Sequence, residues 1–481
     1  MNNLERTYHF INGLTRSEKR YFKKYADLHR PQTDQDYILL FKIISSQKDF
    51  DLVNIKAQID QNKIKYVSIK TQYLYKTLLE ALTQYKKNKH VGIQLNDLLQ
   101  QLFILEGKGL LEEALVYCKK IKRKAYKIDN YTVCFQVVKK ELEVLSLLHH
   151  GLSNTNILQC YAEKTQLFDI MSHIQAYENL RNQFIIKRQD NQLTSDYLED
   201  LKQHELIVNP PNSSLKSQIL YYQILALVHF GEKNFKQMLH CATQSLDLLP
   251  IAHFSPSFTF SILRNYFVAC QLSGYEQGFL YVSQLLEQMN FKEKPFIAMK
   301  LFLQYNIKIQ LLRTAALEEE LETFYDSIQK FQDHFVSALS WKNKKNWWFD
   351  LIDFYFAKQR FDKVSDVVAY FNKATEYKTL LPIEKTVLRL LQAILYFENQ
   401  EDRLLLREIR GIKRVVATHE IKHPLITNTL HLLQDLNKNT ADKHVAFFKK
   451  YLVNNQAVSS LLKESIWSLD FLIAWSQCHL K

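Results

Sequence analysis

Four arginines recur at regular intervals near the C-terminal end of the chain. They are Arg403, Arg407, Arg410 and Arg414. Steps of 4, 3 and 4 residues place them on one stripe of an α-helix. A guanidinium can bind a carboxylate or a phosphate through two parallel hydrogen bonds. The stripe is therefore a candidate patch for an anion or an acidic partner, and the alternative interpretation is a solvated helix face.

Two other clusters of cations have the same two interpretations. One lies on a predicted helix and contains Lys119, Lys120, Arg123, Lys124 and Lys127. The other surrounds aromatic residues near the N-terminus and contains Lys19, Arg20, Lys23 and Lys24. In addition, the segment 341–348 places lysines among tryptophans, a pattern typical of single-stranded nucleic-acid sites. We expect Trp348 to pack within a helix pair instead, and Trp341 and Trp347 to pack between neighbouring pairs.

Patterns typical of catalysis or metal binding are scarce. His149 and His150 are adjacent, so they point about 100° apart on a helix and suit capping of the helix end before Gly151 better than shared metal binding. The six cysteines are widely spaced and indicate buried thiols in a reducing compartment. The sequence contains neither a phosphate-binding glycine loop nor a zinc-protease histidine pair. We expect no catalytic residue, no cofactor and no metal, and a protein that is not an enzyme.

The net charge of +13 is concentrated at the two ends of the chain. Residues 1–91 contain 17 Lys and Arg against 9 Asp and Glu, residues 92–350 contain 27 against 27, and residues 351–481 contain 19 against 14. Basic ends attract nucleic acid or acidic proteins, and they also keep a protein soluble. Neither a secretory signal pattern nor roughly 18 uninterrupted apolar residues occurs. We expect a soluble, cytoplasmic protein without a membrane span.

A repeat of about 41 residues runs through most of the chain. Each repeat is predicted to hold two helices, and only a neighbouring pair can bury the apolar face of each pair. We therefore expect an all-α fold, a right-handed helical-repeat solenoid of about nine helix pairs. The second helices are predicted to begin at Leu111, Leu152, Thr194, Phe235, Tyr275, Leu317, Phe361, Asp402 and Asp442.

The predicted helices divide the chain into three parts. Residues 1–91 form a basic helical N-terminal unit, residues 92–455 form the solenoid, and residues 456–481 form a C-terminal capping helix. In the first part, Thr15 and Glu18 form a capping box, and helices are predicted at about 15–29, 36–46 and 64–85. In the solenoid, helices are predicted at 92–106, 110–127, 131–150, 155–170, 173–189, 194–205, 213–230, 234–248, 257–272, 276–289, 295–313, 316–334, 345–357, 361–375, 384–397, 401–417, 423–436 and 442–453.

One helix pair resembles a tetratricopeptide repeat. The residues at the signature and packing positions of that family are Trp348, Leu351, Tyr355, Val364, Val368 and Phe371. The pattern of helix pairs resembles the family over about 390 residues, but the signature residues match in only about three repeats. Bulky residues (Met238, Ile352 and Val364) occupy positions where the family has small ones, and the period exceeds the family's 34 residues. The dimensions of the family's groove therefore do not carry over.

The resemblance implies that ligands bind to inward-facing positions of the first helices. The matching residues are Arg264, Gln271, Asn346, Asp350 and Asp353. It favours a scaffold or adaptor that binds a protein or peptide partner on a concave face. Two alternatives stay open: a nucleic-acid-binding protein that uses the basic terminal regions, and a regulatory sensor whose N-terminal unit responds to a small ligand or peptide.

Overall fold

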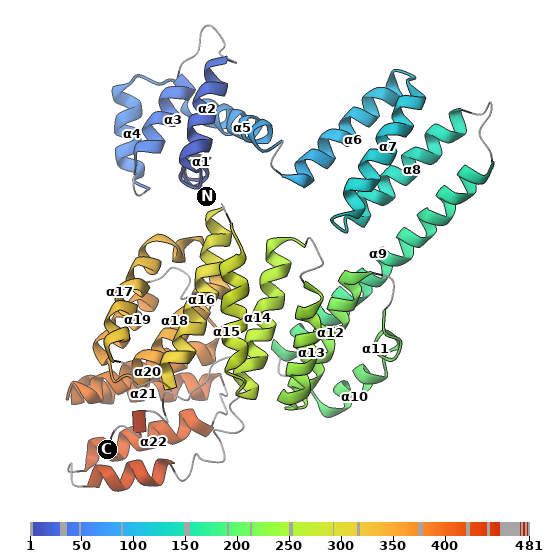
Figure 1. Ribbon diagram of the computed structural model, residues 1–481. Helices are drawn as coiled ribbons and strands as arrows, with labels where there is room; N and C mark the ends of the chain where they lie inside the picture. The colour runs from blue at the N-terminus through green and yellow to red at the C-terminus, as the bar shows by residue number, and fades with distance from the viewer. Residues whose placement is uncertain are drawn as a thin grey trace. The chain divides into compact units, whose positions relative to one another are not determined.

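The computed structural model is helical throughout its described part, which contains no β-strand (Figure 1). The described residues are 3–28, 36–47, 50–87, 90–148, 154–189, 192–211, 214–249, 254–291, 293–314, 318–373, 378, 380–419, 424–439, 443–452, 472, 475, 476 and 479. Two compact units are present. The first contains residues 1–228 and 247–254, and the second contains residues 229–246 and 255–481.

Five helices share one core at the start of the first unit. They are α1 (Asn3–Asn12), α2 (Arg16–Leu28), α3 (Asp36–Ser46), α4 (Leu52–Gln61) and α5 (Val67–Lys86). Fully buried side chains such as Phe22, Tyr37 and Phe41 fill this core. The sequence predicted α2, α3 and α5 but missed α1 and α4. Both missed helices are only 10 residues long, so an apolar stripe has fewer than three turns in which to appear.

The predicted capping box at the start of α2 is confirmed. The backbone N–H of Thr15 donates to Glu18 Oε2 at 2.8 Å, and the backbone N–H of Glu18 donates to Thr15 Oγ1 at 3.2 Å. These two bonds satisfy donors that a helix start otherwise leaves without partners. Lys86, the last residue of α5, also lies 3.4 Å from Glu18 Oε1, so the capping carboxylate joins the beginning of α2 to the end of α5.

Four further helices continue the first unit. They are α6 (Val91–Gly107), α7 (Leu111–Tyr126), α8 (Tyr131–Leu147) and α9 (Asn154–Gln189). The first three match the predicted ranges. The separate helices predicted at 155–170 and 173–189 are wrong, because α9 is one continuous helix of 36 residues. Buried Ile170 and Tyr177 carry the apolar stripe across the expected break, and no glycine or proline interrupts it.

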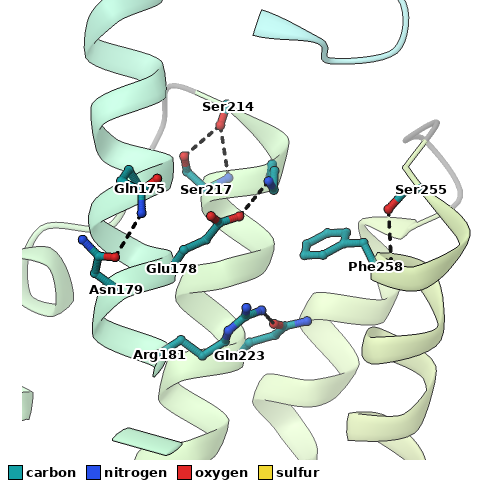
Figure 2. Close-up of polar contacts among 10 residues, drawn as sticks. Gln175, Glu178, Asn179, Arg181, Ser214, Ser217, Gln223, Ser255 and Phe258 are labelled. Atoms are coloured by element: carbon teal, nitrogen blue, oxygen red, sulfur yellow. Dashed lines mark hydrogen bonds and ion pairs between the residues drawn. The ribbon is translucent and has the colours of Figure 1, made fainter. Parts of the chain in front are cut away.

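The second half of α9 is held by polar contacts within the first unit. Its neighbours there are α10 (Ser195–Gln203), α11 (Glu205–Val208) and α12 (Leu215–Gly231). Arg181 Nη1 donates to Gln223 Oε1 at 3.3 Å, and Lys216 Nζ of α12 lies 2.8 Å from Glu178 Oε1 of α9 (Figure 2). Tyr177 Oη donates to the Leu206 carbonyl at 2.8 Å. The two halves of α9 therefore pack against different sets of helices.

The second unit follows the predicted helix pairs closely. Its helices are α13 (Phe235–Asp247), α14 (Pro256–Ser273), α15 (Gln277–Gln288), α16 (Lys294–Thr314), α17 (Glu318–His334), the 3₁₀ helix η2 (Val336–Ala338), α18 (Trp341–Ala357), α19 (Phe361–Lys373), α20 (Pro382–Glu398), α21 (Asp402–Thr418) and α22 (Pro424–Lys438). Ser340 caps α18, which therefore begins four residues before the predicted start at 345. Ser255 caps α14 in the same way (Figure 2).

The residues that carry the tetratricopeptide resemblance lie in the core of the second unit. Trp348, Leu351 and Tyr355 of α18 are buried, as are the matching residues of α19. Gly278 of α15 is buried where α15 contacts α14. A Cβ atom at this glycine would lie 2.3 Å from Cys270 Sγ, so the close packing of α14 on α15 requires a residue without a side chain.

The predicted capping segment 456–481 lies largely outside the described residues. Of its described members, Leu472, Trp475 and Ser476 are buried. Trp475 Nε1 donates to Glu398 at 2.6 Å, which ties this part of the chain to the end of α20.

Candidate functional site

Three first helices of the second unit bring polar side chains together. Helix α16 contacts both α14 and α18. Arg264 Nη1 of α14 donates to Asn343 Oδ1 of α18 at 3.0 Å, so this bond joins two helices that flank α16. Asn343 Nδ2 also donates to Met299 Sδ of α16 at 2.9 Å. We call the polar residues around this junction the first-helix row: Arg264, Asn306, Asn343, Asn346 and Asp350.

The guanidinium of Arg264 is a partly desolvated cation. Burial lowers its pKa, and the nearby carboxylate of Asp350 acts in the opposite direction. Charges interact more strongly where water is partly excluded, because the effective dielectric constant is lower there. A ligand that offers an oxygen atom to this guanidinium would gain a stronger interaction than it would at the open surface.

Asn306 contributes a buried polar atom without a partner. This residue is 6% exposed, and no hydrogen bond to its Oδ1 occurs among the described residues. Asn306 follows Met299 by seven residues, and Asp350 follows Asn343 by the same interval. Residues seven apart share one helix face. A buried acceptor without a partner costs about 1–3 kcal/mol, so Asn306 lowers the stability of the second unit.

The five residues that the sequence singled out are placed as follows. Arg264 and Asp350 lie close enough to interact electrostatically. Asn346 and Asp353 are half-buried on α18, and Gln271 is exposed near the end of α14. The structure therefore brings Arg264 and Asp350 together, and two more of the five lie on α18, the helix that carries Asp350.

Sequence reasoning missed Asn306 and Asn343. A signal for Asn306 was present, because it stands between the apolar residues Tyr305 and Ile307 in a predicted first helix. The position of Asn343, seven residues before Asp350, was a second signal, since it places both residues on one helix face.

The arginine stripe lies on α21 as the spacing predicted. Its four guanidinium-bearing residues are exposed, whereas Leu405, Ile409 and Ile412 of the same helix are buried. Glu408 lies on α21 as well, but its carboxylate faces Arg389 of α20, with 2.5 Å between Nε and Oε1. The stripe is separate from the first-helix row, because it belongs to a second helix.

The cation cluster on α7 has a different arrangement. Lys119, Arg123 and Lys127 are exposed, and Lys124 Nζ donates to Gln94 Oε1 of α6 at 3.3 Å. Lys120 lies over the ring of Tyr117. Most of the predicted cluster is therefore a solvated helix face, with its members spread around the exposed side of α7.

A buried polar cluster that the sequence did not reveal joins α7, α8 and α9. Lys122 Nζ lies 2.6 Å from Glu141 Oε2 and 2.8 Å from Glu163 Oε2. Tyr126 Oη donates to Glu163 Oε1 at 2.7 Å. Burial alone lowers the pKa of Lys122, but its bonds to the two carboxylates outweigh burial and raise it. The signal was a charged residue on an apolar face, because Lys122 follows buried Cys118 by one helical turn.

The thiols next to this cluster are suited to packing. Cys118, Cys134 and Cys160 are buried and form no disulfide. Burial raises the pKa of Cys118 and Cys134 to about 12 and that of Cys160 to about 11. Only the thiolate is a nucleophile. These residues behave as small apolar side chains in the three-helix core.

We expect these three thiols to resist alkylation at pH 8. Their raised pKa values keep them protonated until the pH approaches 11, so an iodoacetamide reaction should modify them only after unfolding. Mass spectrometry of peptides from native and urea-treated protein measures this. Modification of Cys118 in the native protein at the rate of a free thiol would contradict the expectation.

Other sequence candidates do not form a site. His149 and His150 lie outside the described residues. Trp347 and Trp348 are buried, so they are not available to stack on bases, and the pattern of a single-stranded nucleic-acid site at 341–348 was misleading. Among the described residues, no group of histidine, cysteine and acidic side chains is arranged to hold a metal ion.

No described helix is both long enough and apolar enough to cross a membrane. Comparison of the chain with protein-family models, with curated proteins and with solved structures finds no match in any of the three.

Proposed function

We propose that this chain is a non-enzymatic, right-handed tetratricopeptide-like solenoid of about nine helix pairs that binds a protein or peptide partner along its first helices. The observation that supports this most is the first-helix row, in which Arg264 of α14 bonds to Asn343 of α18 across α16, next to the carboxylate of Asp350. A reducing, cytoplasmic location fits the five buried cysteines that form no disulfide.

The composition of the row suits the backbone of an extended peptide. The carboxamide of half-buried Asn346 has both a donor and an acceptor, so it can pair with the N–H and C=O groups of one peptide unit. Arg264 and Asp350 add charges of opposite sign at the centre of the row. A dedicated site for a C-terminal carboxylate would carry an excess of cations. An internal segment of mixed polarity is therefore the ligand that the row fits best.

The proposal predicts that peptide binding depends on Asn346. A random peptide library displayed on phage is selected against the full-length protein, and the enriched peptides are labelled for fluorescence anisotropy. Asn346→Ala and Asp350→Asn are each expected to weaken binding about tenfold, which corresponds to about 1.4 kcal/mol, the upper range for one net hydrogen bond.

Asn372→Ala is the matched control for this experiment. Asn372 is an exposed asparagine on α19, the second helix of the same pair, and its removal should leave peptide affinity unchanged. The proposal fails if no peptide is enriched by the wild-type protein, or if the enriched peptides bind all three variants equally well.

A further inference from the structure

We infer that the exposed face of α21 binds the phosphodiester backbone of a nucleic-acid duplex. This inference is independent of the proposed peptide site, because it concerns a second helix and a different set of side chains. The face is defined by Arg403, Arg407, Arg410, Lys413 and Arg414, all of which are exposed.

The choice of cation on this face indicates recognition of oxyanions. The chain contains 63 Lys and Arg residues, of which 15 are Arg. Lysine is thus the usual cation of this protein, yet four of the five cations on the exposed face of α21 are arginines. Both residues would serve equally well for solubility. Arginine differs by its planar fork of donors, which pairs with two oxygens of a phosphate and loses little hydration on contact.

The spacing of the arginines suits a partner of high and regular charge density. With a rise of 1.5 Å per residue, the eleven steps from Arg403 to Arg414 span about 16 Å. Each strand of a duplex places about five phosphates along that distance, at 3.4 Å per phosphate. A backbone of this charge density that crosses the stripe would therefore offer oxyanions to several of its guanidinium groups.

The charge of the stripe is only slightly offset by acidic residues of the same helix. Between Asp402 and Thr418 the acidic residues are Asp402 and Glu408. Glu408 is engaged by Arg389, and Asp402 lies in the first turn, where a negative charge is favourable for the helix dipole.

The rest of the face disfavours other polyanionic partners. The apolar side of α21 is buried through Leu405, Ile409 and Ile412, so it cannot enter a bilayer. Leu406 is 36% exposed, and an acidic amphipathic helix would find little other apolar surface on α21 to bury. The helix contains no aromatic residue on which unpaired bases could stack. Contact with the backbone of a duplex is what this surface allows.

The test measures binding of the full-length protein to labelled 24-base-pair RNA and DNA duplexes by fluorescence anisotropy. We expect binding that weakens steeply between 50 and 200 mM salt, as counterion release requires. Arg407→Gln/Arg410→Gln removes two phosphate contacts. It should weaken binding about tenfold or more and make the slope of log K against log salt shallower by about 1.8, at about 0.9 per contact.

The control removes the same amount of charge from another second helix. Lys119→Gln/Lys127→Gln replaces two exposed lysines of α7 and should change duplex affinity less than about twofold, because the remaining effect is long-range and screened. Equal affinity for RNA and DNA would support recognition of the backbone alone, and a preference for one would identify the duplex form that binds. Both sets of substitutions are on the surface, so thermal melting should be unchanged.

Three results would overturn the inference. The first is an absence of duplex binding at 50 mM salt. The second is an equal loss of affinity in the α7 control. The third is displacement of the duplex by a poly-glutamate peptide at an equal or lower concentration, which would reassign the face to an acidic protein.

Discussion

Replacement of Lys122 by methionine is expected to destabilise the first unit by about 3–5 kcal/mol, the range found when one partner of a buried ion pair is removed. The side chain of Lys122 is 16% exposed, and that of Glu141 is 8% exposed. Without the cation, Glu141 and Glu163 would be two neighbouring carboxylates with little access to water. Their desolvation would no longer be offset by Coulomb attraction, and they would also repel each other.

Hydrogen exchange is the appropriate measurement, because all five tryptophans lie in the second unit and their fluorescence does not report on α7–α9. Amides of residues 111–170 should lose protection in the variant. Lys119→Met on the exposed side of the same helix is the matched control and should change stability by less than about 0.5 kcal/mol.

A second variant separates loss of charge compensation from loss of packing. In Lys122→Met/Glu141→Gln/Glu163→Gln the carboxylates are neutral, and Tyr126 can still donate to the amide oxygen at position 163. This triple variant should recover most of the stability that Lys122→Met loses, since replacing a whole buried ionic group is often nearly neutral. A triple variant as unstable as the single one would show that Lys122 acts through its packing instead.

The same cluster predicts the alkaline limit of stability of the first unit. The pKa values of Lys122, Cys118, Cys134 and Cys160 are all raised in the folded state. A raised folded pKa means that the unfolded chain releases its proton first, so the stabilising contribution is complete below the unfolded pKa and is lost as the pH rises. Protection of α7–α9 should therefore decline from about pH 9, the ordinary pKa of the thiols, to about pH 12. If the free energy of opening measured by hydrogen exchange stays constant between these pH values, the raised pKa values of the folded state are wrong.

Most helix positions were accessible from the sequence because two local signals agree there. Apolar residues recur at helical spacing, and glycine or proline stands between the helices. The prediction failed within α9, where neither glycine nor proline separates the two helices that were expected. A break was inferred there from the repeat period alone, but buried Ile170 and Tyr177 belong to one continuous apolar stripe. The short helices α1 and α4 were missed for a different reason, since each is only 10 residues long and its apolar stripe is brief.

The candidate sites depend on facts that periodicity does not contain. Spacing indicates the face on which Arg264 lies, but it does not show that α14 and α18 approach each other closely enough across α16 for Arg264 to reach Asn343. Lys122 stands among exposed cations in the sequence, and only its helical phase relative to Cys118 separates it from them. The exposed stripe of α21 was predicted correctly in its geometry, because it needs no partner from another helix.

Trp347 provides the largest expected effect in the second unit. Its side chain is fully buried, and its ring centroid lies 5.0 Å from that of Phe331 and 5.9 Å from that of Tyr305. These partners belong to α17 and α16, so Trp347 of α18 packs one helix pair against the preceding one. Trp347→Ala should cost about 3–5 kcal/mol, the usual range for truncation of a buried aromatic residue to alanine.

Trp347→Phe should cost less than half as much. The indole Nε1 of Trp347 has no hydrogen-bond partner among the described residues, so phenylalanine loses ring volume but no hydrogen bond. Urea unfolding followed by fluorescence of the other four tryptophans measures both variants, with half-buried Trp341 changed to alanine as the control on the same helix. In a helical repeat the interface between neighbouring pairs carries the cooperativity. Trp347→Ala should therefore also broaden the transition, whereas Trp341→Ala should shift it without broadening. If both alanine variants shift it equally and neither broadens it, the packing of α18 on α16 and α17 does not depend on Trp347.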